Sequence, residues 1–436
     1  MTDERDAPGL PAAWLYCSNV YPLFAPSVGV PAGGMETRAA LFGRGLAATG
    51  RWQVHFVVSD FGQPFHTRHE GIDFHICQPA YRRAGRNVFP RLRRHGGAPL
   101  LRFDRSDLAL LWQVPLIAAW LALPGLFFPR FWRGLRPGAV CCFGNNALSA
   151  EVIADCRRAG IRTMLCIASD KDLSPDYRPG NREANHYGMP KWKGHYSLAH
   201  ADRIVVQSED QREALRRHFG RDAALIRNPV AITPSDPQDW PPRGQREHVL
   251  WIGRTDDFNK RPMRFLELAR DCPDLTFVMV IARTDEAAFR ALERDRPANL
   301  RILADVPAQD IPEQLRRARA LVNTSRFEGF PNTFLQAAVA GAPIVSVGVD
   351  PDGMLGRHGC GLVAEDTPQS LREAVARLCR DDALADALAD ASHRYALARH
   401  ELSGRLDEFA ACLAALAAVG PVAARMPWWS AWRRFA

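Results

Sequence analysis

Short apolar runs alternate with amphipathic stretches through the first half of the chain. Runs of about five apolar residues are typical of buried strands. We expect such strands at Trp14–Cys17, Val54–Ser59, Ile72–Cys77, Ala139–Phe143, Thr163–Ala168 and Arg203–Gln207. Between them, Met35–Ala48 and Ala150–Arg158 have the spacing of amphipathic helices. Strands that alternate with helices predict a parallel, doubly wound sheet.

The alternation stops at a proline-rich stretch and then starts again. Residues 231–246 have the composition of a linker that buries little. The second set of strands is expected at Val249–Ile252, Leu275–Ile281, Leu300–Leu303, Ala320–Asn323, Pro343–Val347 and Gly361–Ala364. We therefore expect one α/β domain over 1–230, a second over 247–400, and a C-terminal helix and tail over 401–436. Open α/β sheets bind ligands at the carboxyl ends of their strands, which predicts a cleft between the domains.

Composition adds one local feature to this picture. The 436 residues are 47% hydrophobic and 24% charged, which excludes a disordered, collagenous or coiled-coil protein. The formal net charge of +8 is confined to residues 51–150, which hold 13 basic and 5 acidic side chains. Its centre is the basic run 82–94, where six arginines occur without an acid. Such a run is typical of a solvated loop, or of contact with an anionic surface.

An apolar segment follows the basic run. Leu108–Pro129 contains 22 consecutive uncharged residues, the length of a membrane span. Pro115, Pro124 and Gly125 interrupt it, and a crossing would divide one sheet between the two sides of a membrane. Two interpretations of this segment remain. It could form a buried pair of helices, or a hairpin that enters one leaflet of the membrane. The neighbouring arginines favour the hairpin, because anionic lipid attracts each of them by about 1 kcal/mol.

The cysteines and the terminal segments bear on the cellular compartment of the protein. Ten cysteines occur without metal or redox spacing, and Cys141, Cys142 and Cys166 lie in apolar runs typical of the core. The N-terminus lacks the basic start and apolar region of a signal peptide. We expect a cytoplasmic protein, peripheral at the inner face of the membrane. The aromatic and basic segment Met426–Phe435 would pack on the first domain or rest at the membrane interface.

The segment with the clearest chemistry follows the expected strand Ala320–Asn323. A turn carries Glu328, Gly329, Phe330 and Pro331, and a helix is expected to begin near Asn332. Free N–H groups at a helix start bind phosphate oxygens. A carboxylate at the same place would repel phosphate unless it accepts hydrogen bonds from hydroxyl groups, such as those of a sugar.

These residues resemble the retaining GT-B glycosyltransferases of family 4. That family has Glu-x7-Glu in its second domain, and here Glu328-Gly329-Phe330-Pro331 is followed by Gln336-Ala337. The resemblance implies two Rossmann-like domains that face a cleft, with a C-terminal helix that crosses back to the first domain. The second acid is replaced by Gln336, which could share in holding the nucleotide ribose and could alter the nucleotide preference.

Other matches follow the order of the family. Gly253, Arg254 and Lys260 resemble its diphosphate clamp, and Gly33-Gly34 resembles its glycine-rich loop. The resemblance implies that Glu328, Arg254 and Lys260 are catalytic. Donor-binding residues would be Gly253, Gly329, Phe330, Pro331, Asn332, Thr333, Gln336, Gly33 and Gly34. On the acceptor side we expect Glu36, Asn145 and Asp170, with Lys171 and Asp172 beside them, although ordinary loop polarity explains the last three equally well.

The implied reaction moves a hexose, with retention of configuration, from a nucleotide-diphosphate sugar to a hydroxyl of a glycan or lipid-linked acceptor. We expect no cofactor, no metal and no nucleic-acid partner. Asp350-Pro351-Asp352 imitates an Asp-x-Asp metal motif, but it occurs late in the chain and is predicted to be a turn. Two alternatives are a nucleotide-sugar epimerase of the same fold and a binding protein without catalysis.

Overall fold

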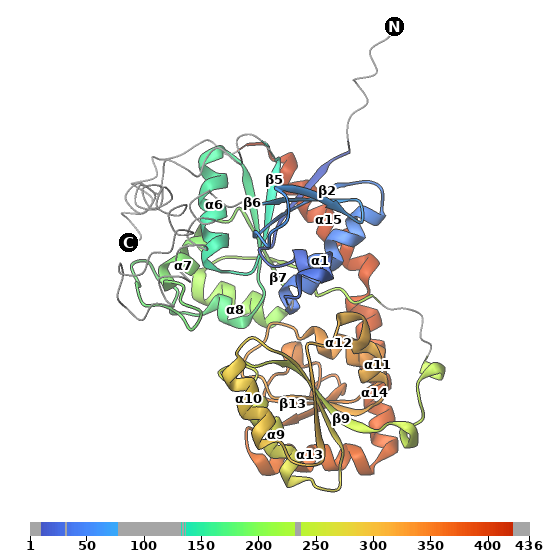
Figure 1. Cartoon of the computed structure of the whole chain (residues 1–436). Helices are drawn as coiled ribbons and strands as arrows, with labels where there is room; N and C mark the ends of the chain where they lie inside the picture. Colours follow the sequence, from blue (N-terminus) through green and yellow to red (C-terminus); the bar gives the residue numbers. More distant parts are fainter. Residues whose placement is uncertain are drawn as a thin grey trace, which may run out of the picture.

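The chain folds into two α/β domains, one above the other in Figure 1. The structure is a computed structural model, and it describes residues 10–30, 33–76, 137–231 and 237–421 together with Trp132 and Leu135. Each domain is a central sheet with helices on both faces. The predicted doubly wound architecture is therefore confirmed.

The first domain contains an eight-stranded sheet with the order β3-β4-β2-β1-β5-β6-β7-β8. All neighbouring strands are parallel except β3 and β4. The strands are β1 (Ala12–Tyr16), β2 (Gln53–Val58), β3 (His66–His69), β4 (Ile72–Ile76), β5 (Ala139–Phe143), β6 (Arg162–Cys166), β7 (Arg203–Val206) and β8 (Ala224–Leu225). All six strands predicted in this half are present, within about two residues at each end.

No apolar run in the sequence marks β3, which departs from the predicted parallel sheet at this edge. His66–His69 is polar and half exposed, and it pairs antiparallel with β4 through a turn at Glu70 and Gly71. Both turn residues have positive φ, of 51° and 76°. A short polar edge strand lacks the apolar run that identifies a buried strand.

Two hydrophobic layers enclose this sheet. Helix α1 (Gly34–Ala48) packs on one face, where Phe42 and Leu46 are fully buried. The opposite face is covered by α6 (Ala147–Ala159), α7 (Lys191–His200) and α8 (Glu209–Phe219). Cys141 and Cys142 are buried on opposite faces of β5, and Cys166 is buried on β6, as the apolar pattern predicted.

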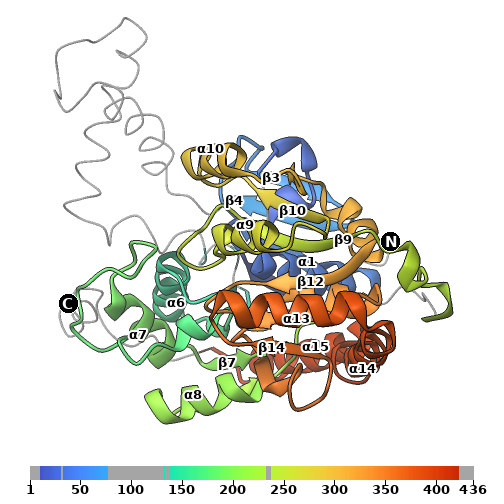
Figure 2. The same ribbon diagram turned by 90° about the horizontal axis from the view of Figure 1, so that it is seen from below.

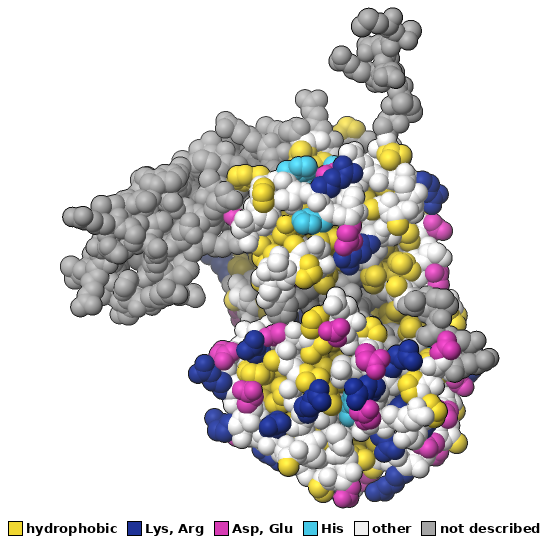
Figure 3. Space-filling view, turned by 45° about the vertical axis from the view of Figure 1, so that its right-hand side comes forward, with side chains coloured by type: hydrophobic (Ala, Val, Ile, Leu, Met, Phe, Trp, Pro, Cys, Tyr) yellow, Lys and Arg dark blue, Asp and Glu magenta, His cyan; other side chains and the backbone are white. Residues whose placement is uncertain are grey.

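The second domain contains a six-stranded parallel sheet with the order β11-β10-β9-β12-β13-β14. One face is covered by α9 (Pro262–Asp271), α10 (Glu286–Asp295) and α13 (Pro368–Arg380), and α9 and α13 lie in front in Figure 2. The other is covered by α11 (Ile311–Arg316), α12 (Asn332–Val339) and α14 (Asp382–His400). The strands are β9 (His248–Arg254), β10 (Phe277–Ala282), β11 (Leu300–Ala304), β12 (Ala318–Asn323), β13 (Ile344–Val347) and β14 (Gly361–Ala364). Charges of both signs are interspersed over this domain in Figure 3.

The last described helix returns to the first domain, as expected. Helix α15 (Leu402–Ala418) packs against α1, and the ring of Phe409 stacks on Phe42 with centroids 4.3 Å apart. Helices α14 and α15 are separated at Glu401, which is not helical, so α15 lies within 401–436, where the C-terminal helix was expected. Val230 pairs with Glu401 there, so both connections between the domains lie side by side.

Part of the predicted linker 231–246 packs on the second domain. Residues 237–246 pack on the second domain, where the indole of Trp240 donates to the carbonyl of Val339 (3.1 Å). The guanidinium of Arg243 is buried and pairs with Asp386. The composition hid this docking because a few large side chains, rather than an apolar run, make the contacts.

Several expectations lie outside the described residues. These are the basic run 82–94, the apolar segment 108–129 and the aromatic tail 426–435. Within the described ranges, no helix combines the length and apolarity needed to span a bilayer.

Candidate active site

The topological switch point of the second sheet lies between β9 and β12. In the second domain the chain leaves β9 to one side for β10 and β11, then returns to β12 on the other side. The loops after β9 and β12 therefore diverge around one crevice at the carboxyl edge, where ligands bind in open α/β sheets. These loops, 255–261 and 324–331, carry most of the residues that the sequence singled out.

Lys260 and Glu328 form an ion pair across this crevice. Their side chains are 24% and 15% exposed, so a ligand can still reach both. Asn259 connects the two loops, because its carbonyl accepts from Arg326 N (2.9 Å) and its Oδ1 accepts from Phe327 N (3.1 Å). The loop geometry holds the amine and the carboxylate in register before any ligand arrives.

Arg254 lies at the end of β9 and connects to this pair through Asp256. The guanidinium of Arg254 pairs with the Asp256 carboxylate (3.1 Å), whose other oxygen accepts from Asn259 N (3.1 Å). The backbone carbonyl of Asp256 accepts from Lys260 N (2.8 Å). One turn of chain thus presents both cations of the expected clamp at the same edge. Gly253 precedes Arg254, and a side chain on it would collide with the Trp251 ring, 2.5 Å from its Cβ position.

Gly329 lies at a close contact between the second domain and the first. A Cβ atom there would lie 2.7 Å from the carbonyl oxygen of Ala168 and 2.8 Å from Gln211 Nε2. The next residue, Phe330, is buried and donates its N–H to Gln207 Oε1 (3.1 Å). These two residues of the motif therefore form the contact between the domains, which explains why glycine is needed.

The beginning of α12 faces the beginning of α1. Asn332 is the first residue of α12 after Pro331, and its Nδ2 donates to the carbonyl of Gly34 (2.9 Å). Asn228 Nδ2 donates to Asn332 Oδ1 (3.0 Å) and fixes this bridge. Gly33 and Gly34 open α1 on the other side. Two helix starts with partial positive charge thus converge at the cleft, an arrangement that suits an anion.

The remaining motif residues line α12. Thr333 and Gln336 are half-buried in its first two turns. The Gln336 side chain makes no hydrogen bond within the described residues, so its amide is free to meet a ligand.

On the first domain, Asp170 stands next to Glu328. Asp170 N donates to the carbonyl of Glu328 (3.2 Å), and its carboxylate accepts from Gln211 Nε2 (3.0 Å). The side chain is open to solvent, yet the surrounding protein desolvates it, and nearby Asp210, Asp172 and Glu328 add negative charge. Desolvation and these carboxylates outweigh the Gln211 hydrogen bond and raise the pKa of Asp170 to about 7. Asp170, which was expected on the acceptor side, therefore lies beside Glu328.

Asn145 was expected on the acceptor side, and the structure contradicts this. The side chain is buried, and its Nδ2 donates to the carbonyls of Asp172 (3.0 Å) and Gly194 (3.1 Å). Asp172 also has a structural role, because its carboxylate accepts hydrogen bonds from Ala168 N (2.8 Å) and Ser169 N (3.2 Å). A polar residue after a strand gives no sign of whether it turns inward or toward the cleft.

Glu36 caps its own helix. Its Oε2 accepts from Gly33 N (3.0 Å), which satisfies a free N–H at the start of α1. The carboxylate is buried and holds the glycine loop in shape, a role that differs from the acceptor contact expected for it.

Asp352 lies in a 3-10 turn (Pro351–Gly353) that Asp350 immediately precedes, so the predicted turn is present. Asp352 Oδ1 accepts from Glu209 N (2.7 Å) at the start of α8, and its Oδ2 pairs with buried Arg227. Asp350 accepts from Leu355 N (2.6 Å). Both carboxylates therefore serve the turn and the contact between the domains.

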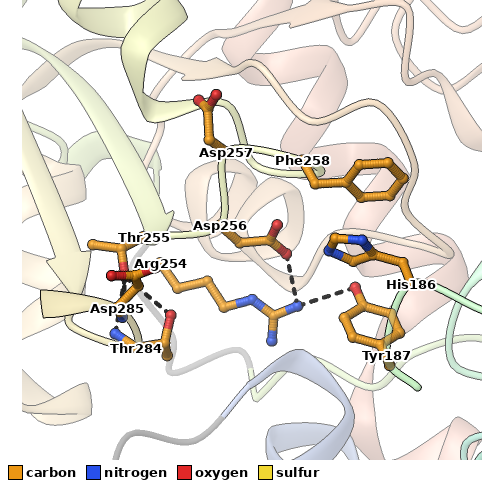
Figure 4. A pocket seen from close by; sticks show the side chains of 9 residues that line it. All are labelled: His186, Tyr187, Arg254, Thr255, Asp256, Asp257, Phe258, Thr284 and Asp285. Atoms are coloured by element: carbon orange, nitrogen blue, oxygen red, sulfur yellow. Dashed lines mark hydrogen bonds and ion pairs between the residues drawn. The ribbon is translucent and has the colours of Figure 1, made fainter. Parts of the chain in front are cut away.

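Sequence reasoning missed an aromatic group beside Arg254. His186 and Tyr187 come from the first domain, and Phe258 comes from the loop after β9. Figure 4 shows Arg254 reaching across the pocket to the Tyr187 hydroxyl, to which it donates (3.3 Å). No motif marks these residues, since Tyr187 and Phe258 lie in loops. Large aromatic residues in polar loops are the only signal the sequence offers.

Two family models match consecutive parts of the chain. Residues 33–231 match the "Glycosyl transferase 4-like domain", and residues 246–381 match "Glycosyl transferases group 1". A curated relative, the lipopolysaccharide 1,6-galactosyltransferase of Salmonella typhimurium, is 26% identical over 183 residues. These residues are 38% of this chain and 50% of the relative, so the match spans about half the length of that protein.

Solved structures share the fold over nearly the whole chain. Sucrose-phosphate synthase from Thermosynechococcus elongatus superposes with a TM-score of 0.64 and 16% identity, covering 94% of this chain and 100% of that one. WaaG, a glycosyltransferase involved in lipopolysaccharide biosynthesis, superposes with a TM-score of 0.54 and 13% identity, covering 92% and 99%. The two domain matches and this shared architecture place the chain among the GT-B glycosyltransferases.

Proposed function

We propose that the protein is a retaining hexosyltransferase that moves a sugar from a nucleotide-diphosphate donor to a hydroxyl of an envelope glycan or lipid-linked acceptor. The observation that carries this proposal is the Lys260–Glu328 pair at the mouth between the domains, next to the start of α12. A cation for phosphate and a carboxylate for hydroxyl groups stand side by side. The Salmonella relative named above, a lipopolysaccharide galactosyltransferase, supports the envelope glycan as acceptor class.

The proposed chemistry needs a stabilised leaving group and a fixed sugar. Arg254, Lys260 and the N–H groups at the start of α12 would hold the diphosphate through preorganised electrostatics. Glu328 would accept hydrogen bonds from the sugar hydroxyls and fix the pose of the ring. Gln336 would share in holding the ribose.

The reaction would proceed on one face of the sugar. The bond from the anomeric carbon to the phosphate oxygen breaks, and its electron pair remains on the diphosphate. The acceptor oxygen bonds to the anomeric carbon from the same side, and its proton passes to the departing phosphate. This route needs no separate base and retains the configuration.

The binding-protein alternative fits the site less well. In a protein that only bound a phosphate ligand, a carboxylate paired with the phosphate-binding amine would weaken the binding of that anion. Both partners are present here and partly exposed.

Lys260→Ala tests the donor clamp. We expect the nucleoside diphosphate that most raises the melting temperature of the wild type to bind at least about tenfold more weakly, a loss of about 1.4 kcal/mol. The substitution removes a phosphate contact and leaves the Glu328 carboxylate unpaired. Isothermal titration calorimetry measures the affinity. Lys193→Ala is the matched control, because Lys193 is 19% exposed and pairs with Glu151 (3.1 Å) away from the cleft. Unchanged affinity in Lys260→Ala would argue against the clamp.

Peripheral binding at the membrane surface is part of the proposal. Deletion of 108–129 is expected to release the protein from vesicles that contain anionic lipid, because the deletion removes the apolar anchor. Co-sedimentation measures the bound fraction. Equal binding of the deletion variant and the wild type would favour a buried helical pair.

A further inference from the structure

We infer that the pocket beside Arg254 binds a hexopyranose unit of the acceptor glycan. This inference rests on the proposed transferase function and names the ligand class of a subsite next to its centre. The pocket encloses about 420 Å³, within the roughly 300–1,000 Å³ of small-molecule sites. Both domains line it, at the mouth of the cleft.

The aromatic side of the pocket is built in advance. The His186 ring stacks on Phe258 with centroids 3.9 Å apart, and it meets Tyr187 edge to face at 5.3 Å. Asn185 holds this loop, because its Oδ1 accepts from Tyr187 N and Met189 N, each at 3.0 Å. Despite this order, the side chains of Tyr187 and Phe258 are 61% and 40% exposed. Rigid, exposed aromatic rings beside a cavity offer an apolar surface to a ligand.

The opposite side of the pocket is polar and mostly anionic. It contains the carboxylates of Asp256, Asp257 and Asp285 and the hydroxyls of Thr255 and Thr284. Asp256 is paired with Arg254, and Asp285 Oδ1 caps α10. Asp257 is exposed and has no hydrogen-bond partner within the described residues. Carboxylates accept hydrogen bonds, so this wall suits a ligand rich in hydroxyl groups.

Arg254 lines the pocket and also belongs to the proposed donor clamp, so the diphosphate would meet the pocket at this guanidinium. The carboxylates of Asp256, Asp257 and Asp285 make the rest of this wall unfavourable for phosphate. The other residues assigned to the donor (Lys260, Glu328, Asn332, Thr333 and Gln336) do not line the pocket. A pyranose matches both walls, since its C–H face packs on aromatic rings and its rim carries hydroxyl groups.

The position of the pocket fits an acceptor. Asp256 lines it, and the backbone carbonyl of Asp256 accepts from the N–H of Lys260, which pairs with Glu328. A sugar seated against Tyr187 therefore lies one turn of chain from the reacting centre. Lys171 of the first domain contacts the same loops, with its Nζ 4.0 Å from the centroid of the Phe258 ring and 4.2 Å from that of the Phe327 ring.

The test uses the full chain and four probes, the methyl α- and β-glycosides of glucose and galactose. Saturation-transfer NMR at about 10 mM glycoside, a range suited to millimolar affinity, is expected to show transfer to the ring protons of at least one probe. Phe258→Ala and Asp257→Asn should each weaken that glycoside about fivefold and leave the affinity for nucleoside diphosphate within about twofold. Asp274→Asn is the matched control, because Asp274 is exposed at the opposite edge of the sheet.

The inference is overturned if none of the four glycosides binds, or if neither pocket variant weakens the glycoside. It is also overturned if both variants weaken the nucleoside diphosphate as much as the glycoside, since the pocket would then hold the nucleotide. Binding of a glycoside through Phe258 without donor turnover would contradict the proposed function and support the ligand class of the pocket.

Discussion

Asp170 shows how a single residue can couple the cleft to pH. Its pKa is raised to about 7 by desolvation, with further contributions from the neighbouring carboxylates Asp210, Asp172 and Glu328. In the unfolded chain the same group ionises near its ordinary value of 3.8. Between these values the folded protein keeps a proton that the unfolded chain has released. This contribution to stability is present at low pH and is lost as the pH rises through 7.

Asp170→Asn removes the charge that is unfavourable above pH 7. We expect the variant to melt at a higher temperature than the wild type at pH 8, with a smaller difference at pH 5, where the Asp170 carboxyl is protonated in the folded state. Melting temperature across pH 5–8 is the measurement, and Asp274→Asn serves as the control on the opposite edge. A difference that does not change with pH would contradict the raised pKa.

For single residues, the sequence predicted which side chains lie near the cleft better than it predicted their hydrogen-bond partners. The residues Glu328, Lys260 and Asp170 come from three loops and meet at one edge, as the strand pattern suggested. Asn145 and Glu36 turned to the scaffold instead, because each found a nearby backbone partner. The partner of Glu36 is local, whereas Asn145 turns inward toward carbonyls of Asp172 and Gly194, which come from distant segments that a single sequence does not record.

Among the described elements, helices α14 and α15 join the two domains. Helix α14 belongs to the second domain, and α15 completes the core of the first, where Phe409 is fully buried between Phe42 and Phe143. A continuous helix could not serve both cores, so the break at Glu401 is a consequence of the fold. The side chain of Glu401 caps α15 by accepting from Ser403 N (2.9 Å).

Phe409→Ala should destabilise the protein by about 3–5 kcal/mol, the usual result of removing a buried phenyl ring. The cost would appear in the first domain although the residue is close to the end of the chain. Urea unfolding measures it, and Leu397→Ala, which truncates a 42% exposed side chain on α14, is the control. A loss below about 1 kcal/mol would mean that α15 is not part of the core of the first domain.

The elements that the sequence predicted well are those with an apolar signature. Buried strands such as β5 and β12 are recognisable because both of their faces are covered. The polar edge strand β3 and the docked segment 237–246 have no such pattern. Their positions follow from pairing with β4 and from the packing of Trp240 and Arg243, which are tertiary effects.

For the whole molecule, the contact between the domains is polar and specific. Asp352, held at a φ of 54°, caps the start of α8 and pairs with Arg227, while the Asp210 carboxylate accepts from Asp352 N (2.7 Å). The Asn332–Gly34 bridge and the contact of Gly329 with Ala168 continue this contact toward the cleft. The domains therefore meet through groups that fix their orientation, and the loops that carry Lys260 and Glu328 are aligned as a result.

The central claim is that Glu328 supports sugar transfer from a nucleotide-diphosphate donor. The most direct measurement is the release of nucleoside diphosphate from a panel of nucleotide sugars with a glycan acceptor, compared between the wild type and Glu328→Gln. We expect at least one donor to be turned over, and we expect the variant to lose about 100-fold or more in rate with an unchanged melting temperature. Glu313→Gln, on α11 outside the cleft, should keep the wild-type rate. Wild-type turnover by Glu328→Gln would contradict the account.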